Sequence, residues 1–319
     1  MINRDPLVSI GMPVYNGEQF IRESLDSLLA QDYDNFELII SDNASTDRTQ
    51  EICKEYLAKD SRIQYYCNLT NLGAVKNFNR VFELSHGKYF MWASDHDLWH
   101  PTFLSRCISI LEDDALVVLA YSRTESIDSE GNSLYLYKDQ INTRGMPPLN
   151  RYKYLLNNLS KCNMIYGLIR SEVLNDTDLF KNIIGPDNLL LAELALEGYF
   201  VQIKEVLFYR RKNRSDDCND DDRIYRTLSS LNPVNVGTKT KTSKSNLYCE
   251  LRDAHIKYLA KSSLGFFGGL DASIATCFRF RLNIVDLQFL NSHLPGWLKL
   301  IYSIKGIILY TRYRFAPRV

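Results

Sequence analysis

The sequence lacks the glycine-rich signatures of two large classes of nucleotide-binding enzyme. No Gly-x-Gly-x-x-Gly follows a hydrophobic strand, and no Gly-x-x-x-x-Gly-Lys-Ser/Thr occurs in its 319 residues. The first pattern holds the pyrophosphate of a dinucleotide, and the second holds the phosphates of a nucleoside triphosphate. Sequence support is therefore absent for a dinucleotide oxidoreductase and for a P-loop NTPase.

An excess of charge of either sign is also missing. Lysine and arginine together number 38, aspartate and glutamate together number 38, and the formal net charge is zero. A protein that binds nucleic acid usually carries a basic surface, because it must neutralise phosphates. We therefore expect no nucleic-acid partner, and any site for an anion must be local.

The cysteines form no recognisable framework. There are seven, an odd number, and no two are spaced as Cys-x-x-Cys. This pattern favours free thiols in a reducing compartment over a zinc site or a set of disulfides. Residues 1–8 contain no basic segment that leads into an apolar signal core. We therefore predict a cytoplasmic protein.

The hydrophobic pattern predicts an α/β fold, because short apolar runs alternate with amphipathic segments. The predicted strands are 8–12, 36–41, 63–67, 89–93 and 117–122, and the predicted helices between them are 18–31, 45–57, 74–84 and one after Pro101. Alternation of this kind implies a mostly parallel sheet flanked by helices. Ligands bind such sheets at the carboxyl ends of the strands, so the loops that follow the strands are the candidate site.

The regular alternation ends near residue 126. A turn at 128–132, helices at 149–159 and 189–196 and a strand at 206–209 are expected beyond it. We therefore predict one domain over 1–211, with halves 1–125 and 126–211, then a polar loop or linker over 212–244. Residues 245–319 are predicted to be a C-terminal helical appendage.

Polar side chains follow the first two predicted strands. Pro13, Tyr15 and Asn16 end the first, and Asp42 and Asn43 end the second. Tyr15 offers a face for stacking, Asn16 can bond the edge of a nucleotide base, and Asp42 can accept hydrogen bonds from a ribose or a base. The alternative is an ordinary strand-to-helix turn in which Asn16 caps the next helix.

The next loops carry residues with a possible structural role. Ser45 and Thr46 are expected to cap a helix. Asn71 and Gly73 precede the third helix, where a glycine lets the backbone approach a ligand, and Lys76 lies one turn on and can reach a phosphate. The alternative is that Gly73 marks a helix boundary and nothing more.

The triplet Asp95-His96-Asp97 follows the fourth predicted strand. Two carboxylates separated by one residue can hold Mn²⁺ or Mg²⁺, whose other ligands would be diphosphate oxygens and water. Such a metal would neutralise a departing diphosphate. His96 is a poor ligand for Mg²⁺, although Mn²⁺ would tolerate it, so we expect it to be a bystander.

These motifs, in this order, resemble the family-2 glycosyltransferases with the GT-A fold. The match runs through segments 13–16, 41–47, 71–73 and 92–99, and continues weakly to Arg211. The resemblance implies an inverting enzyme of polysaccharide biosynthesis that moves a sugar from a nucleoside diphosphate, with UDP as the expected nucleotide. The implied acceptor is a saccharide or a lipid-linked saccharide.

The resemblance also implies roles for individual residues. Tyr15 and Asp42 would hold the nucleotide base, Asp95 the ribose side, and Asp97 the metal. Nucleotide and metal would thus bind in 1–125 and the acceptor in 126–211.

An inverting enzyme of this family needs a general base, and segment 185–194 resembles the acidic motif of the family. Asp187 is the candidate, because a carboxylate is ionised at neutral pH and can take a proton from a hydroxyl. The alternative is that Asp187 caps the helix that starts there, and Glu193 is a weaker candidate for the base.

The sequence departs from the family pattern at three places. Pro186 precedes Asp187 where relatives pair two acidic residues, His96 separates the aspartates, and segment 210–213 lacks a histidine that relatives often use on the diphosphate. Two other functions therefore stay open, a nucleotidyltransferase and a non-catalytic protein that binds nucleotide sugars. The first would carry a glycine-rich basic loop after the first strand, and segment 13–16 is not such a loop.

The C-terminal segment from Trp297 onward mixes apolar and basic side chains. Its uninterrupted apolar stretch is too short and too charged to span a bilayer. A helix of this kind can lie on an anionic membrane surface, which would suit an acceptor carried on a lipid. The alternative is a helix packed on the catalytic domain.

Overall fold

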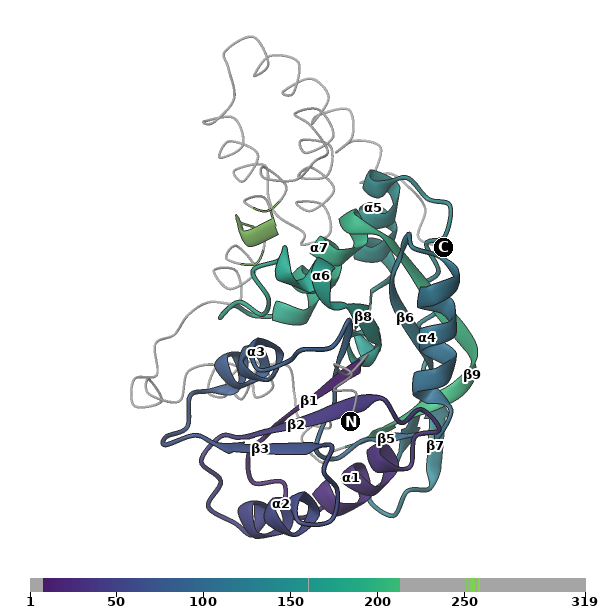
Figure 1. Cartoon of the computed structure of the whole chain (residues 1–319). Helices are drawn as coiled ribbons and strands as arrows, with labels where there is room; N and C mark the ends of the chain where they lie inside the picture. The colour runs from purple at the N-terminus through teal and green to yellow at the C-terminus, as the bar shows by residue number, and fades with distance from the viewer. Residues whose placement is uncertain (1–7, 160, 213–250, 252, 256–257, 259–319) are drawn as a thin grey trace, which may run out of the picture.

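The structure is a computed structural model that describes residues 8–159, 161–212, 251, 253–255 and 258. Its centre is one nine-stranded sheet with the order β3-β2-β1-β4-β8-β6-β9-β5, and β7 pairs with β6 (Figure 1). Apart from Lys212 and a few residues near 255, the predicted linker and C-terminal appendage lie outside the described residues. None of the described helices is long and apolar enough to cross a membrane.

The first part of the sheet is parallel. Its strands are β1 (Val8–Val14), β2 (Phe36–Asp42), β3 (Ile63–Cys67) and β4 (Tyr89–Trp92), connected by α1 (Ile21–Leu29), α2 (Thr49–Leu57) and α3 (Ala74–Glu83). Every residue of β1 and β2 is buried, because helices cover both faces of the sheet. In Figure 1, α3 lies on one side of these strands, and α1 and α2 lie on the other.

The second part of the sheet is mixed. It contains β5 (Leu98–Trp99), β6 (Val117–Ile127), β7 (Ser133–Leu136), β8 (Leu168–Arg170) and β9 (Tyr199–Arg211). Strand β8 runs antiparallel to both β4 and β6, whereas β6 and β9 pair in parallel along most of their length. The predicted α/β sheet flanked by helices is confirmed. Its parallel pairs are β3–β2, β2–β1, β1–β4 and β6–β9, and the pairs that involve β5, β7 or β8 are antiparallel.

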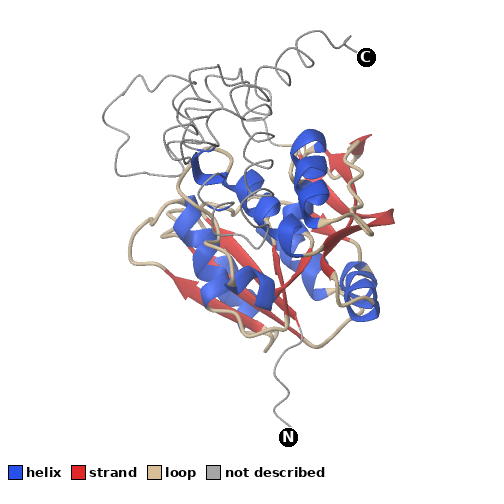
Figure 2. Cartoon of the chain, turned by 90° about the horizontal axis from the view of Figure 1, so that it is seen from above, coloured by secondary structure: helices blue, strands red, loops and turns tan. Residues whose placement is uncertain are grey.

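The remaining helices belong mainly to the second half of the chain. They are α4 (Phe103–Asp113), α5 (Pro148–Asn158), the 3-10 helix η1 (Asn163–Tyr166), α6 (Ser171–Asn175) and α7 (Pro186–Glu197). Colouring by secondary structure shows these helices packed around the strands (Figure 2). The strands β5 and β8 have two and three residues. Such short strands leave no periodicity in the sequence, which is why they were not predicted.

Two hydrophobic cores lie on the two faces of the sheet. One packs α1, α2 and α4 against the sheet, and includes Leu25, Ile52 and Leu104. The other packs α3, α5 and α7 against the opposite face, and includes Phe90 and Trp92. With both faces covered, the polar edge at the carboxyl ends of β1–β4 is the part of the sheet left for a ligand.

Candidate active site

The loops after β1 and β2 are joined by hydrogen bonds. The backbone N–H of Asn16 donates to Ser45 Oγ at 2.9 Å, and the N–H of Thr46 donates to Asn16 Oδ1 at 2.8 Å. Asn16 adopts a left-handed backbone with φ 53°. The expectation that Ser45 and Thr46 cap α2 is wrong, because both bond Asn16 and α2 begins only at Thr49. Nor does Asn16 cap α1, which begins at Ile21.

The loops after β2 and β3 are joined in the same manner. Asn43 Nδ2 donates to Asn71 Oδ1 at 2.9 Å, and Asn43 Oδ1 accepts the N–H of Leu72 at 2.8 Å. Gly73, at φ 85°, is the residue before α3, and L side chains rarely adopt that backbone. Its role as a helix boundary is confirmed, while contact with a ligand stays a prediction. Lys76 is exposed in the first turn of α3.

Asp42 is buried at the end of β2 with both carboxylate oxygens engaged. Oδ1 accepts the N–H of Ser45 at 2.8 Å, and Oδ2 accepts the hydroxyl of Tyr65 at 2.7 Å. Asp42 therefore shapes the loop, and recognition of a base through it stays a prediction. Tyr15 is 49% exposed, which leaves its ring accessible for stacking, whereas Pro13 is buried within β1.

The loop after β4 packs against the loop after β1. A Cβ atom placed on Gly17 would overlap Asp95 Oδ2 and Val14 Cγ2. The N–H of Gly17 donates to Thr49 Oγ1 at 2.8 Å, which holds the glycine in place. Asp95 can therefore occupy its position only because residue 17 has no side chain.

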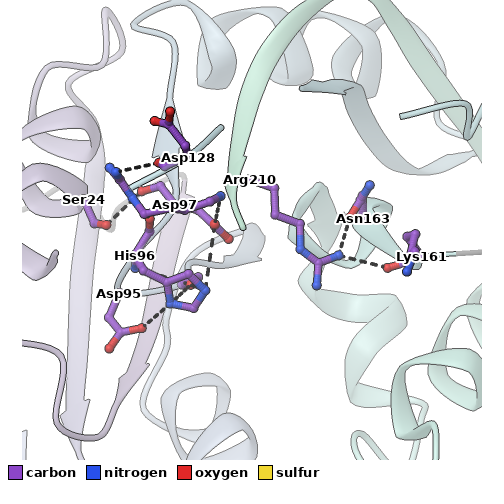
Figure 3. Close-up of polar contacts among 10 residues, drawn as sticks. Ser24, Asp95, His96, Asp97, Asp128, Lys161, Asn163 and Arg210 are labelled. Atoms are coloured by element: carbon purple, nitrogen blue, oxygen red, sulfur yellow. Dashed lines mark hydrogen bonds and ion pairs between the residues drawn. The ribbon is translucent and has the colours of Figure 1, made fainter. Parts of the chain in front are cut away.

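The triplet 95–97 forms a compact acidic loop around an imidazole (Figure 3). His96 Nδ1 lies 2.8 Å from Asp95 Oδ1, and His96 Nε2 lies 3.9 Å from Asp97 Oδ1. Burial lowers the pKa of His96, but the carboxylates of Asp97 and Asp95 outweigh burial and raise this pKa to about 8. The loop therefore attracts positive charge. Ser24 Oγ donates to the Asp97 carbonyl at 2.8 Å and fixes the backbone there.

Arg211 fixes this loop from the end of β9, a contact that no pattern in the sequence predicted. Its N–H donates to Asp97 Oδ1 at 2.8 Å, and its Nε donates to the His96 carbonyl at 3.0 Å. Its Nη1 donates to the carbonyls of residues 128–129, and its Nη2 lies 2.6 Å from Glu23 Oε2. The backbone bond joins residues separated by 114 positions, so no local pattern could have revealed it.

The acidic loop offers hard oxygen ligands but is not by itself a complete metal site. Asp97 is only 1% exposed, and one of its oxygens accepts a backbone N–H. Across the described ranges, no group of three or more His, Cys, Asp or Glu side chains could hold a metal ion. Two carboxylates fit Mn²⁺ or Mg²⁺ provided that other oxygens, such as those of a diphosphate, complete the coordination.

Asp187 lies in the first turn of α7, after Gly185 at the N-cap position with φ 63°. Asp187 itself is therefore not the N-cap, contrary to that alternative. Burial raises the pKa of Asp187, while hydrogen bonds from Cys162 and from the N–H of Asn188 lower it. A carboxylate whose pKa is raised toward neutrality is better suited to accept a proton.

Tyr166 and Arg210 connect Asp187 with the acidic loop. Burial is the main cause that raises the pKa of Tyr166, and the charges of Asp97, Asp187 and Asp95 raise it further, while Arg210 lowers it. Tyr166 is partly buried against the core, and both sets of carboxylates act on its hydroxyl. The structure therefore brings the predicted metal loop and the predicted base to the same region.

Glu193, the weaker candidate for the base, is buried on another side of α7. It is 1% exposed, and neither carboxylate oxygen has a hydrogen-bond partner within the described ranges. It lies six residues after Asp187, which places it on a different face of the helix. Burial raises its pKa to about 7, although Lys181, 3.7 Å away, opposes this shift. A carboxylate enclosed in this way does not reach an acceptor hydroxyl.

An α/β sheet with polar loops at β1–β3 and an Asp-x-Asp loop after β4 is the architecture of GT-A glycosyltransferases. Comparison with known families agrees, because the profile described as glycosyl transferase family 2 matches residues 9–180. An uncharacterised glycosyltransferase of Rickettsia typhi is 34% identical over 249 residues, 76% of this chain and 74% of the relative. The chain belongs to glycosyl transferase family 2 and is a glycosyltransferase.

Solved structures share the fold at low sequence identity. Staphylococcus aureus TarS 1–349 has a TM-score of 0.55 at 17% identity, covering 86% of this chain and 89% of TarS 1–349. The same protein has been solved with UDP-GlcNAc. The mannosyltransferase PcManGT of Pyrobaculum calidifontis, solved with GDP-Man and Mn²⁺, has a TM-score of 0.50 at 17% identity, covering 98% of this chain and 83% of the mannosyltransferase. These neighbours establish the GT-A fold and bind nucleotide sugars themselves.

Proposed function

We propose that the protein is an inverting glycosyltransferase that moves a sugar from a nucleoside diphosphate to a saccharide or lipid-linked saccharide. Asp97, with Asp95, holds Mn²⁺ or Mg²⁺, and Asp187 is the general base. The metal and the base are proposed to act on opposite ends of one bond.

The observation that carries the proposal is that adjacent residues of β9 bond both regions: the N–H of Arg211 donates to Asp97 Oδ1 at 2.8 Å, and Arg210 Nη1 donates to Asn163 Oδ1 at 2.6 Å. Cys162, next to Asn163, donates in turn to the side chain of Asn188, the residue after Asp187, at 3.6 Å.

The donor is proposed to be a UDP-sugar. Support comes from TarS, which has been solved with UDP-GlcNAc, although PcManGT has been solved with GDP-Man and Mn²⁺. The proposed nucleotide contacts come from the loops after β1–β3, which hydrogen bonds fix before any ligand arrives. The proposed contact residues are Pro13, Tyr15, Asn16, Asp42, Asn43, Asn71, Gly73 and Lys76, with Asp95 on the ribose side.

The proposed reaction is a single displacement at the anomeric carbon. Asp187 takes the proton from the acceptor hydroxyl as its oxygen bonds to the sugar carbon, and the bond from that carbon to the diphosphate breaks. The proton ends on Asp187, and the electron pair ends on the diphosphate. A bound divalent cation would supply charge neutralisation for this leaving group. Arg211 keeps Asp97 in place, because the backbone bond and the side-chain bonds of this arginine fix the loop.

The cellular setting is proposed on the sequence alone. A lipid-linked acceptor would be consistent with cytoplasmic polysaccharide biosynthesis and with peripheral membrane contact through the segment from Trp297 onward. That segment lies outside the described residues. Binding of the full chain to anionic liposomes would test this part.

The test is a pair of substitutions with a matched control. Asp187→Asn should lower sugar transfer about 10²- to 10⁴-fold, the usual contribution of a general base, while UDP binding persists. Asp97→Asn should abolish the stimulation of UDP binding by Mn²⁺. The control, Asp176→Asn, changes an exposed aspartate at the end of α6 and should leave both unchanged.

Three results would contradict the proposal. Full transfer activity in both variants would exclude the mechanism. Binding of UDP without any donor turnover by the wild type would favour a non-catalytic binding protein. A product that retains the anomeric configuration of the donor, read by NMR, would exclude inversion.

A further inference from the structure

Helix α7, which carries Asp187 in its first turn, is apolar on every side. Every residue from Leu189 to Leu196 is buried, and all of them except Glu193 are leucine or alanine. A helix on the surface of a globular protein is apolar along one stripe, whereas a helix that is apolar all round is covered on all faces. The sheet and α5 cover part of α7. Another part of the chain must cover the rest.

Residues that follow β9 in the chain supply this cover. Leu251, residues 253–255 and Tyr258 are helical and form the C-terminal strap. Leu251 is 2% exposed and His255 is 1% exposed, so both side chains are enclosed. Tyr258 packs against the same core as α5 and α7. Figure 1 shows the strap as a light green turn beside α7.

The C-terminal strap contacts α7 at both of its ends. At the start of the helix, a Cβ atom placed on Gly185 would lie 3.6 Å from Leu251 Cδ2, which is ordinary van der Waals contact. At the other end, the hydroxyl of Tyr258 donates to Glu197 Oε1 at 3.3 Å. Gly185 is the N-cap residue of α7. Leu251 therefore packs where the chain turns into the helix, just before Asp187.

His255 joins the strap to α5. Its Nδ1 lies 3.0 Å from the hydroxyl of Tyr152, and each of these two residues is 1% exposed. Burial, with the charge of Lys181, lowers the pKa of His255 to about 3, so the imidazole is neutral. Helix α5 in turn holds the far end of α7, because Arg151 donates to the carbonyls of residues 195–196, both at 2.6 Å. The strap, α5 and α7 are thus one packed unit.

We propose that Leu251 and His255 are positioning residues, which set the place of Asp187 by holding α7 against α5. The inference rests on the proposed function, because it bears on catalysis only if Asp187 is the base. Both residues act through α7, since Asp187 moves with the helix that carries it. A base must lie within hydrogen-bond reach of the acceptor hydroxyl, so a displacement of about 1 Å is enough to slow transfer strongly.

The experiment removes the hydrogen bond between the strap and α5 in the full chain. Tyr152→Phe and His255→Leu should each lower kcat for sugar transfer about tenfold and change KM for the donor less than about twofold. His255→Asn, whose amide can replace Nδ1, should restore most of the kcat. Leu251→Ala, which leaves a gap beside Gly185, should lower kcat in the same way.

The dependence of kcat on pH separates positioning from a loss of folded protein. In the wild type, kcat rises with pH as Asp187 loses its proton. Burial raises the pKa of Asp187, while Cys162 and Arg210, which the variants leave in place, lower it. A loosened α7 lets water reach this carboxyl, so the rise in kcat should move to lower pH in Tyr152→Phe and His255→Leu. A smaller folded fraction would leave that pH unchanged.

The matched control is Tyr56→Phe, which removes the hydroxyl of another buried tyrosine, a donor to Asp26 at 2.6 Å on the side of α1 and α2. It should leave kcat and its pH dependence as in the wild type. Unchanged kcat in Tyr152→Phe and His255→Leu, with both folded by circular dichroism, would overturn the inference. So would a lower kcat with neither a shift in pH dependence nor rescue by His255→Asn.

Asp187→Asn is measured in parallel and separates this inference from the proposed function. Full transfer by Asp187→Asn would overturn the proposed base and the positioning role together. A loss of transfer in Asp187→Asn, with no change in the strap variants, would overturn the positioning role alone.

Discussion

The two halves of the catalytic domain build their parts of the site by different means. In the first half, neutral amides and hydroxyls join neighbouring loops, as in the bonds of Asn16 with Ser45 and of Asn43 with Asn71. In the second half, the residues that contact other parts of the candidate site are charged. They are Arg210 and Arg211 of β9 and Asp187 of α7. The loops proposed to bind the nucleotide are therefore joined by neutral polar contacts between neighbouring loops. The acidic loop and the region of the proposed base are instead linked by charged residues that lie far apart in the chain.

The largest expected effect on stability follows from removing the side chain of Arg211, which bonds residues of both halves. Arg211→Met would leave the carbonyls of His96, Asp128 and Ser129 without their donor in a buried place. We expect the free energy of unfolding to fall by about 3 kcal/mol or more, because each buried carbonyl left without its donor costs about 1–3 kcal/mol. Urea denaturation measures it.

The matched change in the first half is Arg48→Met. Arg48 pairs with Glu51 on the surface, where solvent screens the pair and it contributes little to stability. If Arg48→Met lowered the free energy of unfolding as much as Arg211→Met, the two halves would not differ in how their arginines stabilise the fold.

The second prediction uses two buried glutamates. Glu193 lacks a hydrogen-bond partner in the part of the chain that the structure describes, and burial raises its pKa to about 7, above its ordinary value of 4.5. The folded state therefore holds a proton that the unfolded state releases between pH 4.5 and 7. The contribution of Glu193 to the free energy of unfolding is therefore fully present below about pH 4.5, and it is lost as the pH rises through 7. Relative to Glu193→Gln, the wild type should lose as much as about 3 kcal/mol across that range.

The comparison is Glu37 in the first half, which is also buried but accepts bonds from Gln64 Nε2 at 2.7 Å and from the N–H of His86 at 2.8 Å. Glu37→Gln should lower stability at pH 8 by about 1–3 kcal/mol, because an amide cannot satisfy these donors equally. Glu193→Gln should raise it. Thermal unfolding at pH 5 and pH 8 measures both, and shifts of the same sign would contradict the comparison.

The smallest expected effect lies at the contact between two loops of the first half. Gly17→Ala would push Asp95 aside, because the new Cβ overlaps its carboxylate. We expect KM for the donor to rise about tenfold, equivalent to about 1.4 kcal/mol, with little change in kcat. The control is Gly131→Ala, which strains a backbone at φ 85° but meets no atom within 4 Å. It should lower stability slightly and leave KM unchanged, and an equal rise in KM for both variants would count against the role of residue 17.

The sequence alone was sufficient to predict the strands and helices that produce a local hydrophobic pattern. The alternation of strands and helices predicted β1–β4, and the residues after each strand predicted where the loops meet. Hydrophobic periodicity could not predict β5 and β8, which are too short, or the antiparallel pairing of β8 with β4. It could not predict Arg211 either, because an arginine in a basic stretch looks exposed until the fold shows which oxygens it meets.

The capping of α2 shows the same limit at short range. Ser45 and Thr46 have the composition of helix caps, but a loop 29 or 30 residues earlier competes for their hydrogen bonds. A local propensity describes what a residue can do alone, and tertiary contacts decide which partner it takes.

The bond between Arg211 and Asp97 has a consequence for the order in which the protein becomes active. During synthesis, β1–β4 leave the ribosome well before β9, and domains form from the N-terminal side first. A nascent chain that stops before residue 211 has the loops for a nucleotide but lacks the arginine that holds the acidic loop. Under the proposed function, nucleotide binding would therefore precede sugar transfer during biosynthesis, and transfer would begin only after β9 has paired with β6 and brought Arg211 to the acidic loop.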